Sequence, residues 1–466
     1  MSVPATDAPA THNRGVQRLI SSYRAIPQRA TVRLAKPTSN LFRARAKRDA
    51  PGLDTSGLTN VISVDPAART ADVAGMCTYE DLVAATLPYG LSPLVVPQLK
   101  TITLGGAVTG LGIESASFRN GLPHESVLEM DILTGTGEII TASADRHSDL
   151  FRAFPNSYGT LGYSVRLRIE LEAVPPFVAL RHVRFNSISA LIAAMESIVE
   201  TRGYGGEPVD YLDGVVFSAD EAYLSLGRQT ATPGPVSDYA GKHIYYRSIQ
   251  HPGNDGAEKH DRLTIHDYLW RWDTDWFWCS RAFGAQHPAI RRWWPRRYRR
   301  SSFYWKLIGY DQRFNIADRI ETRSLARPPA PVRERVVQDV ETPIEKTAEF
   351  LDWFLENIPI EPIWLCPLRL RDANGWPLYP INPGHTYVNV GFWSSVPAGP
   401  EPGHTNRLIE AKVSALHGHK SLYSESFYTP EEFDHLYGGE AYKTVKKSYD
   451  PDSRLLDLYA KAVQRR

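Results

Sequence analysis

The sequence is poor in cysteine. Cys77, Cys279 and Cys366 are the only three in 466 residues, and they lie far apart. An odd and sparse set provides neither a disulfide framework nor a CxxC metal or redox motif. This usage is typical of a protein kept in a reducing compartment.

Long hydrophobic runs are also missing. No stretch of about 18 uncharged apolar residues occurs, so the sequence predicts no membrane-spanning segment. The first residues, MSVPATDAPATHNRG, lack the apolar core of a signal peptide. We therefore expect a cytoplasmic protein, either free or peripheral on the inner face of the plasma membrane.

The sequence also lacks a net excess of positive or negative charge. The chain has 53 Lys and Arg against 52 Asp and Glu, a formal net charge of +1. This balance argues against a nucleic-acid partner for the whole molecule. The content of 42% hydrophobic and 11% aromatic residues excludes wholesale disorder.

Local charge is nevertheless uneven. Residues 1–50 hold ten Lys and Arg but only two acids, Asp7 and Asp49. We interpret residues 1–30 as a basic N-terminal arm, which is either solvated or used to bind an anion.

Hydrophobic patterning predicts two α+β units. Residues 31–175 show short strands and helices, and the clearest strand is 163–173, where apolar and charged residues alternate. A second unit begins near residue 176, after Pro175-Pro176, with a strand and a helix over residues 188–201, whose apolar residues recur at helical spacing. Residues 228–262 are polar and predict a long loop.

Glycine is concentrated in two segments. Residues 94–121 contain Gly105, Gly106, Gly110 and Gly112, which would let backbone N–H groups approach an anion or a planar ring. The spacing is not a dinucleotide fingerprint, because Ser115 stands where the third glycine belongs. A second glycine-rich piece spans residues 155–165. On spacing alone, both are either cofactor loops or tight turns between strands.

Four runs carry a resemblance to a known family: VVPQLKTITLGGAVTGLGIES, DLFRAFPNSYGTLGY, PIWLCP (362–367) and FYTPEEF (427–433). They resemble the sterol Δ24-reductase branch of the vanillyl-alcohol oxidase class, and most of all its actinobacterial flavoproteins of tuberculostearic acid synthesis. The resemblance implies an α+β fold. A two-subdomain PCMH-type FAD-binding domain at 31–175 would precede a substrate (cap) domain at 176–426, and residues 427–466 would return to the FAD domain.

The same resemblance implies the cofactors. FAD would be non-covalent, because the first glycine-rich loop has neither the His nor the Cys that usually attaches the flavin, and NADPH would be the electron donor. Residues assigned to FAD in this way are Pro37, Thr38, Ser39, Asn40, Pro97, Thr101, Thr103, Leu104, Gly105, Gly106, Gly110, Gly112, Ile113, Glu114, Ser115, Gly159, Thr160 and Gly162.

The implied reaction reduces an unactivated C=C bond of a lipid, such as the 10-methylene group of a phospholipid acyl chain. Such an alkene has no carbonyl to polarise, so protonation has to lead, from an acid of raised pKa beside π faces. Candidate acids are Glu114, Asp275, Tyr304, Tyr379 and His385. Glu114 could instead make a structural hydrogen bond, and Asp275 could instead pair with Arg271 or Arg281.

Seven of the eleven tryptophans lie between Trp270 and Trp305, and six arginines lie between Arg291 and Arg300. Trp and Arg together suit an anionic membrane surface, so residues 268–306 are interpreted as a membrane-facing segment. Stacking of Arg on aromatic rings at an ordinary surface is the alternative.

Other functions stay open. An alcohol or sugar oxidase could use the same flavin fold, and a non-catalytic lipid-surface protein could retain it. The methyltransferase that makes a methylene precursor is a further expected partner. His417-Gly418-His419 resembles a metal pair, but no further ligands stand nearby in the sequence, so no metal site is expected.

Overall fold

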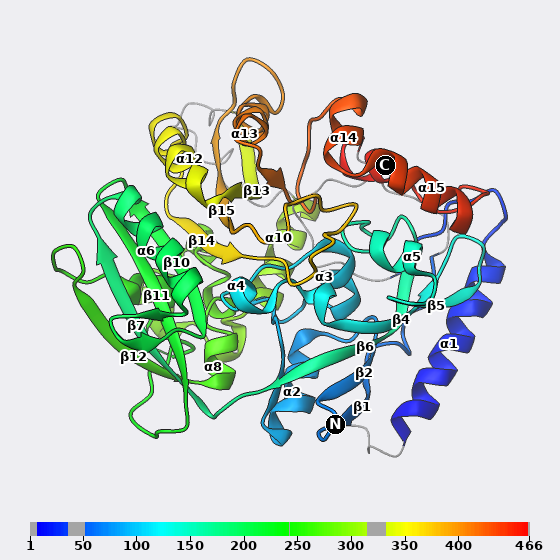
Figure 1. The fold of residues 1–466 in the computed structure, drawn as a ribbon, viewed down its shortest axis with the longest axis horizontal. Helices are drawn as coiled ribbons and strands as arrows, with labels where there is room; N and C mark the ends of the chain where they lie inside the picture. Colours follow the sequence, from blue (N-terminus) through cyan, green and yellow to red (C-terminus); the bar gives the residue numbers. More distant parts are fainter. Residues whose placement is uncertain (1–6, 36–51, 242, 315–331, 465–466) are drawn as a thin grey trace.

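The computed structural model describes residues 7–35, 52–241, 243–314 and 332–464 (Figure 1). Two antiparallel sheets organise these residues, and helices pack on both. The mixed α+β architecture agrees with the fold class predicted from the sequence.

The first sheet has six strands in the order β1-β2-β6-β4-β5, with β3 also paired to β6. Strand β6 (Tyr163–Ala173) is its centre, and the predicted alternation is confirmed because Val165, Leu167, Ile169 and Leu171 are all buried. The remaining strands are β1 (Val61–Asp65), β2 (Thr70–Ala74), β3 (Leu91–Pro93), β4 (Val127–Leu133) and β5 (Ile139–Ser143).

Short helices connect these strands. Helix α2 begins after Thr78, whose hydroxyl accepts a hydrogen bond from the Asp81 backbone N–H, a standard N-cap. The helices of this half are α2 (Tyr79–Thr86), α3 (Leu104–Gly110), α4 (Ser117–Asn120) and α5 (Ser148–Ala153), with 3₁₀ turns at Leu87–Tyr89 and Pro123–Ser126.

The basic N-terminal segment differs from a solvated arm. It forms helix α1 (Ala8–Ala25), which buries Leu19 and Tyr23 against Leu53 and Leu58. The Tyr23 hydroxyl also donates to the Gly135 carbonyl at 2.6 Å. The arginines of this segment therefore lie on the solvent-facing side of a packed helix. The charge pattern indicated these exposed residues but not the buried apolar face.

The second sheet has eight strands in the order β12-β7-β11-β10-β14-β15-β13-β16. They are β7 (Phe177–Phe185), β10 (Tyr211–Ser218), β11 (Glu221–Thr230), β12 (Glu258–Thr264), β13 (Arg333–Pro343), β14 (Ile363–Leu368), β15 (Tyr387–Pro397) and β16 (His419–Lys420). A separate hairpin joins β8 (Gly203–Tyr204) to β9 (Glu207–Pro208).

Helices α6 (Ile188–Thr201), α12 (Ile344–Asn357) and α13 (His404–Ala415) share one apolar core with this sheet (Figure 1). In α6 the six residues at the predicted helical spacing are all buried. The predicted loop at 228–262 was wrong in part, because it contains α7 (Tyr245–Ile249) and strand β12, which pairs with β7 through its backbone despite its polar side chains.

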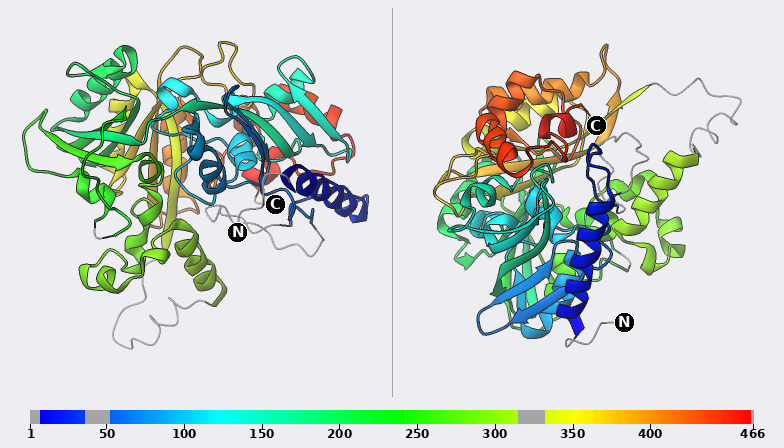
Figure 2. Two further views of the ribbon diagram at one scale, coloured as in Figure 1. Left: turned by 90° about the horizontal axis from the view of Figure 1, so that it is seen from below. Right: turned by 90° about the vertical axis from the view of Figure 1, so that its right-hand side faces the viewer.

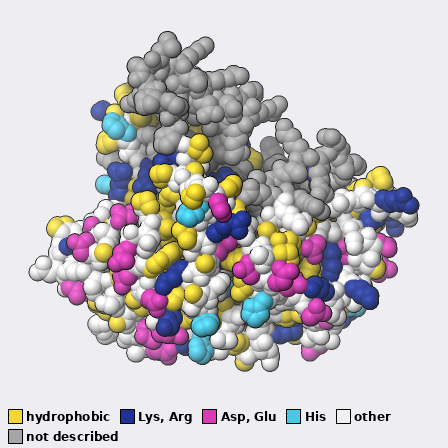
Figure 3. Space-filling view, turned by 90° about the horizontal axis from the view of Figure 1, so that it is seen from above, with side chains coloured by type: hydrophobic (Ala, Val, Ile, Leu, Met, Phe, Trp, Pro, Cys, Tyr) yellow, Lys and Arg dark blue, Asp and Glu magenta, His cyan; other side chains and the backbone are white. Residues whose placement is uncertain are grey.

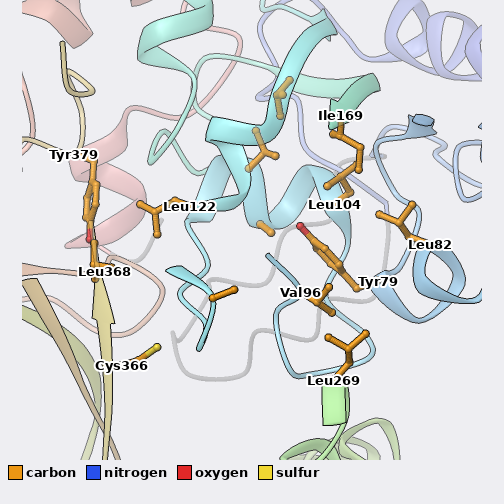
Figure 4. Packing of buried hydrophobic residues seen from close by; sticks show 14 of the residues in the cluster. Tyr79, Leu82, Val96, Leu104, Leu122, Ile169, Leu269, Cys366, Leu368 and Tyr379 are labelled. Atoms are coloured by element: carbon orange, nitrogen blue, oxygen red, sulfur yellow. The ribbon is translucent and has the colours of Figure 1, made fainter. Parts of the chain in front are cut away.

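One hydrophobic core runs through both halves. Figure 4 shows Leu104 and Ile169 of the first half with Cys366 and Leu368 of strand β14, and all four belong to a single buried cluster. The two halves therefore share one apolar interface.

A smaller lobe lies between β12 and β13 in the sequence. It consists of α8 (Ile265–Leu269), α9 (Pro288–Trp293), α10 (Ser301–Phe314) and 3₁₀ turns at Asp273–Asp275, Cys279–Phe283 and Arg296–Tyr298. Helix α10 projects from the body of the molecule in both views of Figure 2.

The C-terminal helices are α14 (Pro430–Leu436), α15 (Gly439–Tyr449) and α16 (Leu458–Ala462). Lys446 on α15 donates through Nζ to the Thr160 carbonyl at 2.7 Å, and Lys461 on α16 donates to the Tyr158 carbonyl. The end of the chain thus contacts the second glycine-rich loop.

Within the described ranges, no helix combines the length and the apolarity that crossing a bilayer requires. Acidic and basic side chains are interspersed over the face drawn in Figure 3, and apolar side chains gather near its middle.

Candidate functional site

A cavity of about 1040 Å³ lies between the two halves of the molecule. One wall comes from the glycine-rich loops of the first half, and the opposite wall comes from the second sheet and the small lobe. Small-molecule pockets usually hold ~300–1,000 Å³. The cavity therefore has room for a large cofactor together with part of a second molecule.

Helix α3 builds the glycine-rich wall. Its N-cap, Thr103, accepts a hydrogen bond from the Gly106 backbone N–H at 3.2 Å. A Cβ at Gly105 would lie 2.2 Å from Ser164 Oγ and 2.6 Å from the Gly75 carbonyl oxygen, so glycine is required there for packing. At Gly106 a Cβ would meet only Thr103 Oγ1, at 2.9 Å, and would otherwise stand in the cavity.

The predicted cofactor residues divide into three groups. Four residues do not line the cavity: Leu104, Ser115, Thr160 and Gly162. Ser115 contacts the small lobe, with its hydroxyl 2.9 Å from that of Tyr268, and the other three are packed inside the first half. Pro37, Thr38, Ser39 and Asn40 lie outside the described residues. The residues that do line it are Pro97, Thr101, Thr103, Gly105, Gly106, Gly110, Gly112, Ile113, Glu114 and Gly159.

Glu114 lies at the cavity wall but is only 6% exposed. Its Oε1 accepts the Gln98 backbone N–H at 2.9 Å, and its Oε2 accepts the Gln98 side-chain amide. Burial raises the pKa of Glu114 to about 8, against the opposing influence of Arg271. Both oxygens therefore hold the loop at Gln98 against the loop at Glu114. This is the structural hydrogen bonding given above as the alternative to a catalytic role for Glu114.

Asp275 does not line the cavity. Its carboxylate pairs with Arg291, with Oδ1 2.7 Å from Nη1, and both side chains are buried. The two arginines expected as its partners are engaged elsewhere, Arg271 by Asp213 and Arg281 by the Glu361 carbonyl. Burial still raises the pKa of Asp275 despite this ion pair.

The other three candidate acids also lie away from the described cavity lining. Tyr304 is buried in the small lobe, where its hydroxyl donates to the Thr274 carbonyl at 3.3 Å. Tyr379 is fully buried beside Leu368 (Figure 4) and packs edge-on against His419. His385 is exposed on the loop before β15.

Residues not predicted from the sequence form the opposite wall, an aromatic chamber made of Trp276, Phe277, Trp364, Trp393 and Tyr423. The centroid of the Phe277 ring lies 4.5 Å from that of Trp393 and 5.6 Å from that of Trp364. These rings come from four separate segments, so no local sequence pattern could have grouped them.

Asp339 of β13 also lines the cavity, beside this chamber. Its Oδ1 accepts the Asn389 side-chain amide at 2.9 Å, and the Tyr423 hydroxyl also bonds to its carboxyl group. Burial raises the pKa of Asp339 to about 6. Opposite it on β15 stands Gly391, where a Cβ would lie 2.5 Å from Asp339 Oδ1 and 2.7 Å from the Trp393 ring.

The first part of the tryptophan-rich segment faces inward. Trp270, Trp272, Trp276 and Trp278 are buried. Of the six arginines, Arg291 and Arg299 are also buried, and Arg299 donates to backbone carbonyls of Arg291, Trp294 and Ala240. Arg296 pairs with Asp238 and Arg300 with Glu80. The interpretation of 268–306 as membrane-facing therefore does not hold for 270–278.

Comparison with known proteins identifies the first half. Residues 17–143 match the family model described as an FAD binding domain. These residues thus resemble an FAD-binding domain. That match begins inside helix α1, consistent with the packing of this helix on the first sheet.

The relationship extends beyond that domain. The Delta(24)-sterol reductase of Homo sapiens is 24% identical over 416 residues, which cover 87% of this chain and 76% of that protein. The Arabidopsis thaliana Delta(24)-sterol reductase is 24% identical over 455 residues, covering 89% and 77%. Cytokinin dehydrogenase 7 of Oryza sativa subsp. japonica is 33% identical, but over only 37% of this chain. Over most of its length the chain thus resembles Delta(24)-sterol reductases at a distance.

The glycine-rich wall fits FAD. Gly106 and Gly110 present backbone without side chains to the cavity, which suits the close approach of a planar ring or a phosphate. Threonine hydroxyls at 101 and 103 stand beside them as hydrogen-bonding groups. The volume left over extends to the aromatic chamber, where a second molecule would have to bind.

Proposed function

We propose that this protein is an NADPH-linked, FAD-dependent reductase of an unactivated C=C bond in a lipid. Its substrate would be the 10-methylene group of a phospholipid acyl chain, which becomes a 10-methyl branch. The observation that carries the proposal is the aromatic chamber opposite the FAD loops, because its rings suit an aliphatic chain and offer few hydrogen-bonding groups to a sugar.

The chain's own residues would bind and orient the alkene. Trp276, Phe277 and Trp393 would contact the hydrocarbon, exclude water and place their π faces near positive charge that develops on a substituted carbon. Bound FAD, once reduced by NADPH, supplies the hydride equivalent for that carbon.

Two related substrates compete within this proposal. The distant relationship to Delta(24)-sterol reductases favours a sterol side chain, whereas the sequence runs that resemble actinobacterial flavoproteins favour a methylene-branched acyl chain. Both are apolar alkenes, and both would occupy the same chamber.

An isotope experiment tests the proposal. The NADPH-reduced protein would be mixed under anaerobic conditions with 10-methylene phospholipid or with a Δ24-sterol, and the product examined by mass spectrometry and NMR. For the methylene lipid we expect deuterium from labelled NADPH at the branched carbon and solvent deuterium in the new methyl group, as CH₂D. Reversed labelling would reject protonation-first chemistry but leave the reductase assignment standing.

Alcohol oxidation is the main alternative on the same fold. If neither alkene reoxidises the reduced flavin while alcohols or sugars support rapid H₂O₂ formation, the protein is an oxidase. Purification without flavin, together with binding to vesicles, would instead support a non-catalytic lipid-surface protein.

Contact with an anionic membrane is a second part of the proposal. On helix α9, Trp293 is 80% exposed and Ile290 is 42% exposed, and Arg292 and Arg297 are exposed beside them. Helix α10 follows directly and supplies Ser302, Trp305 and Lys306 to the cavity wall. A membrane bound at this lobe would therefore lie close to the cavity, and a methyltransferase acting on the same lipid would share that surface.

A further inference from the structure

We propose that Asp339 is the proton donor to the alkene, held in place by Asn389 and Tyr423. This inference rests on the proposed reductase function and assigns its acid to a residue on the chamber side of the cavity. None of the five candidate acids named from the sequence lies on that side.

Position is the first argument. Asp339 lines the same cavity as Trp364, Trp393 and Tyr423, so a chain bound against these rings lies within its reach. The absence of a side chain at Gly391, directly across the strand pair, leaves the space that the Asp339 carboxyl group occupies next to the Trp393 ring. The positions of the Asp339 carboxyl group and of the Trp393 ring therefore both depend on the glycine at 391.

The hydrogen bonds fix the orientation of the carboxyl group. Asn389 Nδ2 donates to Oδ1, and the Tyr423 hydroxyl, which bonds to the same carboxyl group, accepts the Trp393 indole N–H at 2.9 Å. These hydrogen bonds link Asp339 to Trp393 through the Tyr423 hydroxyl. A shift of Trp393 on substrate binding would therefore move the hydroxyl that is bonded to the Asp339 carboxyl group.

The electrostatic surroundings favour a neutral acid. The titratable groups facing Asp339 are Glu341 on the same strand, Tyr423 after β16 and Cys366 on β14, and each is neutral or negative. Among the described residues no Lys or Arg forms an ion pair with Asp339. Burial without a cation raises the pKa of Asp339 to about 6, so below that pH the carboxyl group carries a proton to transfer.

Glu114 is less suited to the same task. Both of its oxygens are occupied by Gln98, and Ser115 N lies 3.4 Å from Oε2. Transfer of its proton would leave a carboxylate that already serves to join two loops. Asp339 instead lines the chamber side of the cavity, where its carboxyl group bonds to Asn389 and Tyr423.

The proposed step transfers one proton and one hydride equivalent to the alkene. The π bond of the alkene breaks, and the exocyclic carbon forms a C–H bond with the proton of Asp339. The substituted carbon receives two electrons and a second hydrogen, as a hydride equivalent that originates in NADPH. Asp339 is left as a carboxylate and regains its proton from solvent.

Asp339→Asn in the FAD-loaded protein tests the assignment, with Glu341→Gln as a matched control. Glu341 is a second buried acid two residues along β13, it has a raised pKa and it does not line the cavity. We expect D339N to slow reoxidation of the NADPH-reduced protein by the lipid alkene ~100-fold or more. The NADPH reduction step should change less than threefold, and E341Q should behave like wild type in both.

Two further readouts separate a chemical role from a structural one. In wild type the alkene step should weaken as pH rises through about 6, and D339N should lose that dependence. Infrared difference spectra should show a protonated carboxyl band that disappears in D339N but not in E341Q. Retention of alkene turnover and its pH profile by D339N would overturn the assignment alone, whereas failure of wild type with every lipid alkene would overturn the proposed function.

Discussion

Asp213 and Arg271 form a buried ion pair, with Asp213 Oδ2 2.8 Å from Arg271 Nη2 and both side chains at most 2% exposed. The indole N–H groups of Trp272 and Trp364 donate to the same oxygen, at 3.1 and 3.2 Å. One carboxylate thus fixes a wall residue of the aromatic chamber, Trp364, to the small lobe.

We expect Asp213→Ala to lower the unfolding free energy by ~3–5 kcal/mol, because it leaves a buried guanidinium without its counter-ion. Asp238→Ala breaks the exposed pair with Arg296, whose side chain is 66% exposed, and should cost about 1 kcal/mol or less. Denaturant titration of both variants measures the difference. Equal losses would contradict the structural role given to Asp213.

Substitution of two neighbouring glycines should separate cofactor binding from folding. Gly106→Leu places its side chain in the cavity, so we expect loss of bound flavin, with a stability cost of ~1 kcal/mol for the disturbed Thr103 cap. Gly105→Ala forces a Cβ against Ser164 and the Gly75 carbonyl, so the apoprotein itself should be destabilised. Flavin absorbance and apoprotein melting temperature distinguish the two effects.

The same flavin should be non-covalent. Acid precipitation of wild type is expected to release the yellow colour into the supernatant. Colour retained in the pellet would show a covalent bond and contradict the expectation.

The raised pKa of Asp339 should make the stability of the fold depend on pH. Its carboxyl group titrates near 4 in the unfolded chain and at about 6 in the folded protein, so the fold favours the protonated form. Its stabilising contribution is complete below pH ~4 and is lost as pH rises through about 6, a change on the order of 3 kcal/mol. The unfolding free energy of wild type should fall relative to that of Asp339→Asn over this interval. Parallel curves would count against a raised pKa.

Membrane binding should depend on the exposed residues of the small lobe. Combined Arg292→Ser, Trp293→Ser and Arg297→Ser should abolish flotation with anionic vesicles at low salt, since each arginine contributes ~1 kcal/mol. Arg24→Ser with Lys447→Ser removes two exposed cations elsewhere and should leave flotation intact. Equal flotation with neutral vesicles would refute an electrostatic contact.

Local patterns predicted local structure well. Helix α6 and strand β6 follow from their apolar spacing, because each buries one face whatever its partner is. Composition could not show that Trp272 and Arg291 face inward, since aromatic and basic residues together suit both a lipid surface and a buried ion-pair network.

Only the glycine-rich wall of the cavity could be predicted from the sequence. Gly106 and Gly110 belong to a compact glycine-rich segment, whereas Asp339, Trp393 and Tyr423 come together through strand pairing across the second sheet. Gly391 could have drawn notice as a glycine within an apolar strand, a sign of close approach by another group.

The contacts of the last helices have a consequence for biosynthesis. Lys446 and Lys461 reach the carbonyls of Thr160 and Tyr158, next to Gly159 in the cavity wall. These lysines emerge from the ribosome some three hundred residues after the loop that they hold. During synthesis the Gly159 loop therefore gains these two contacts only after helices α15 and α16 have been made.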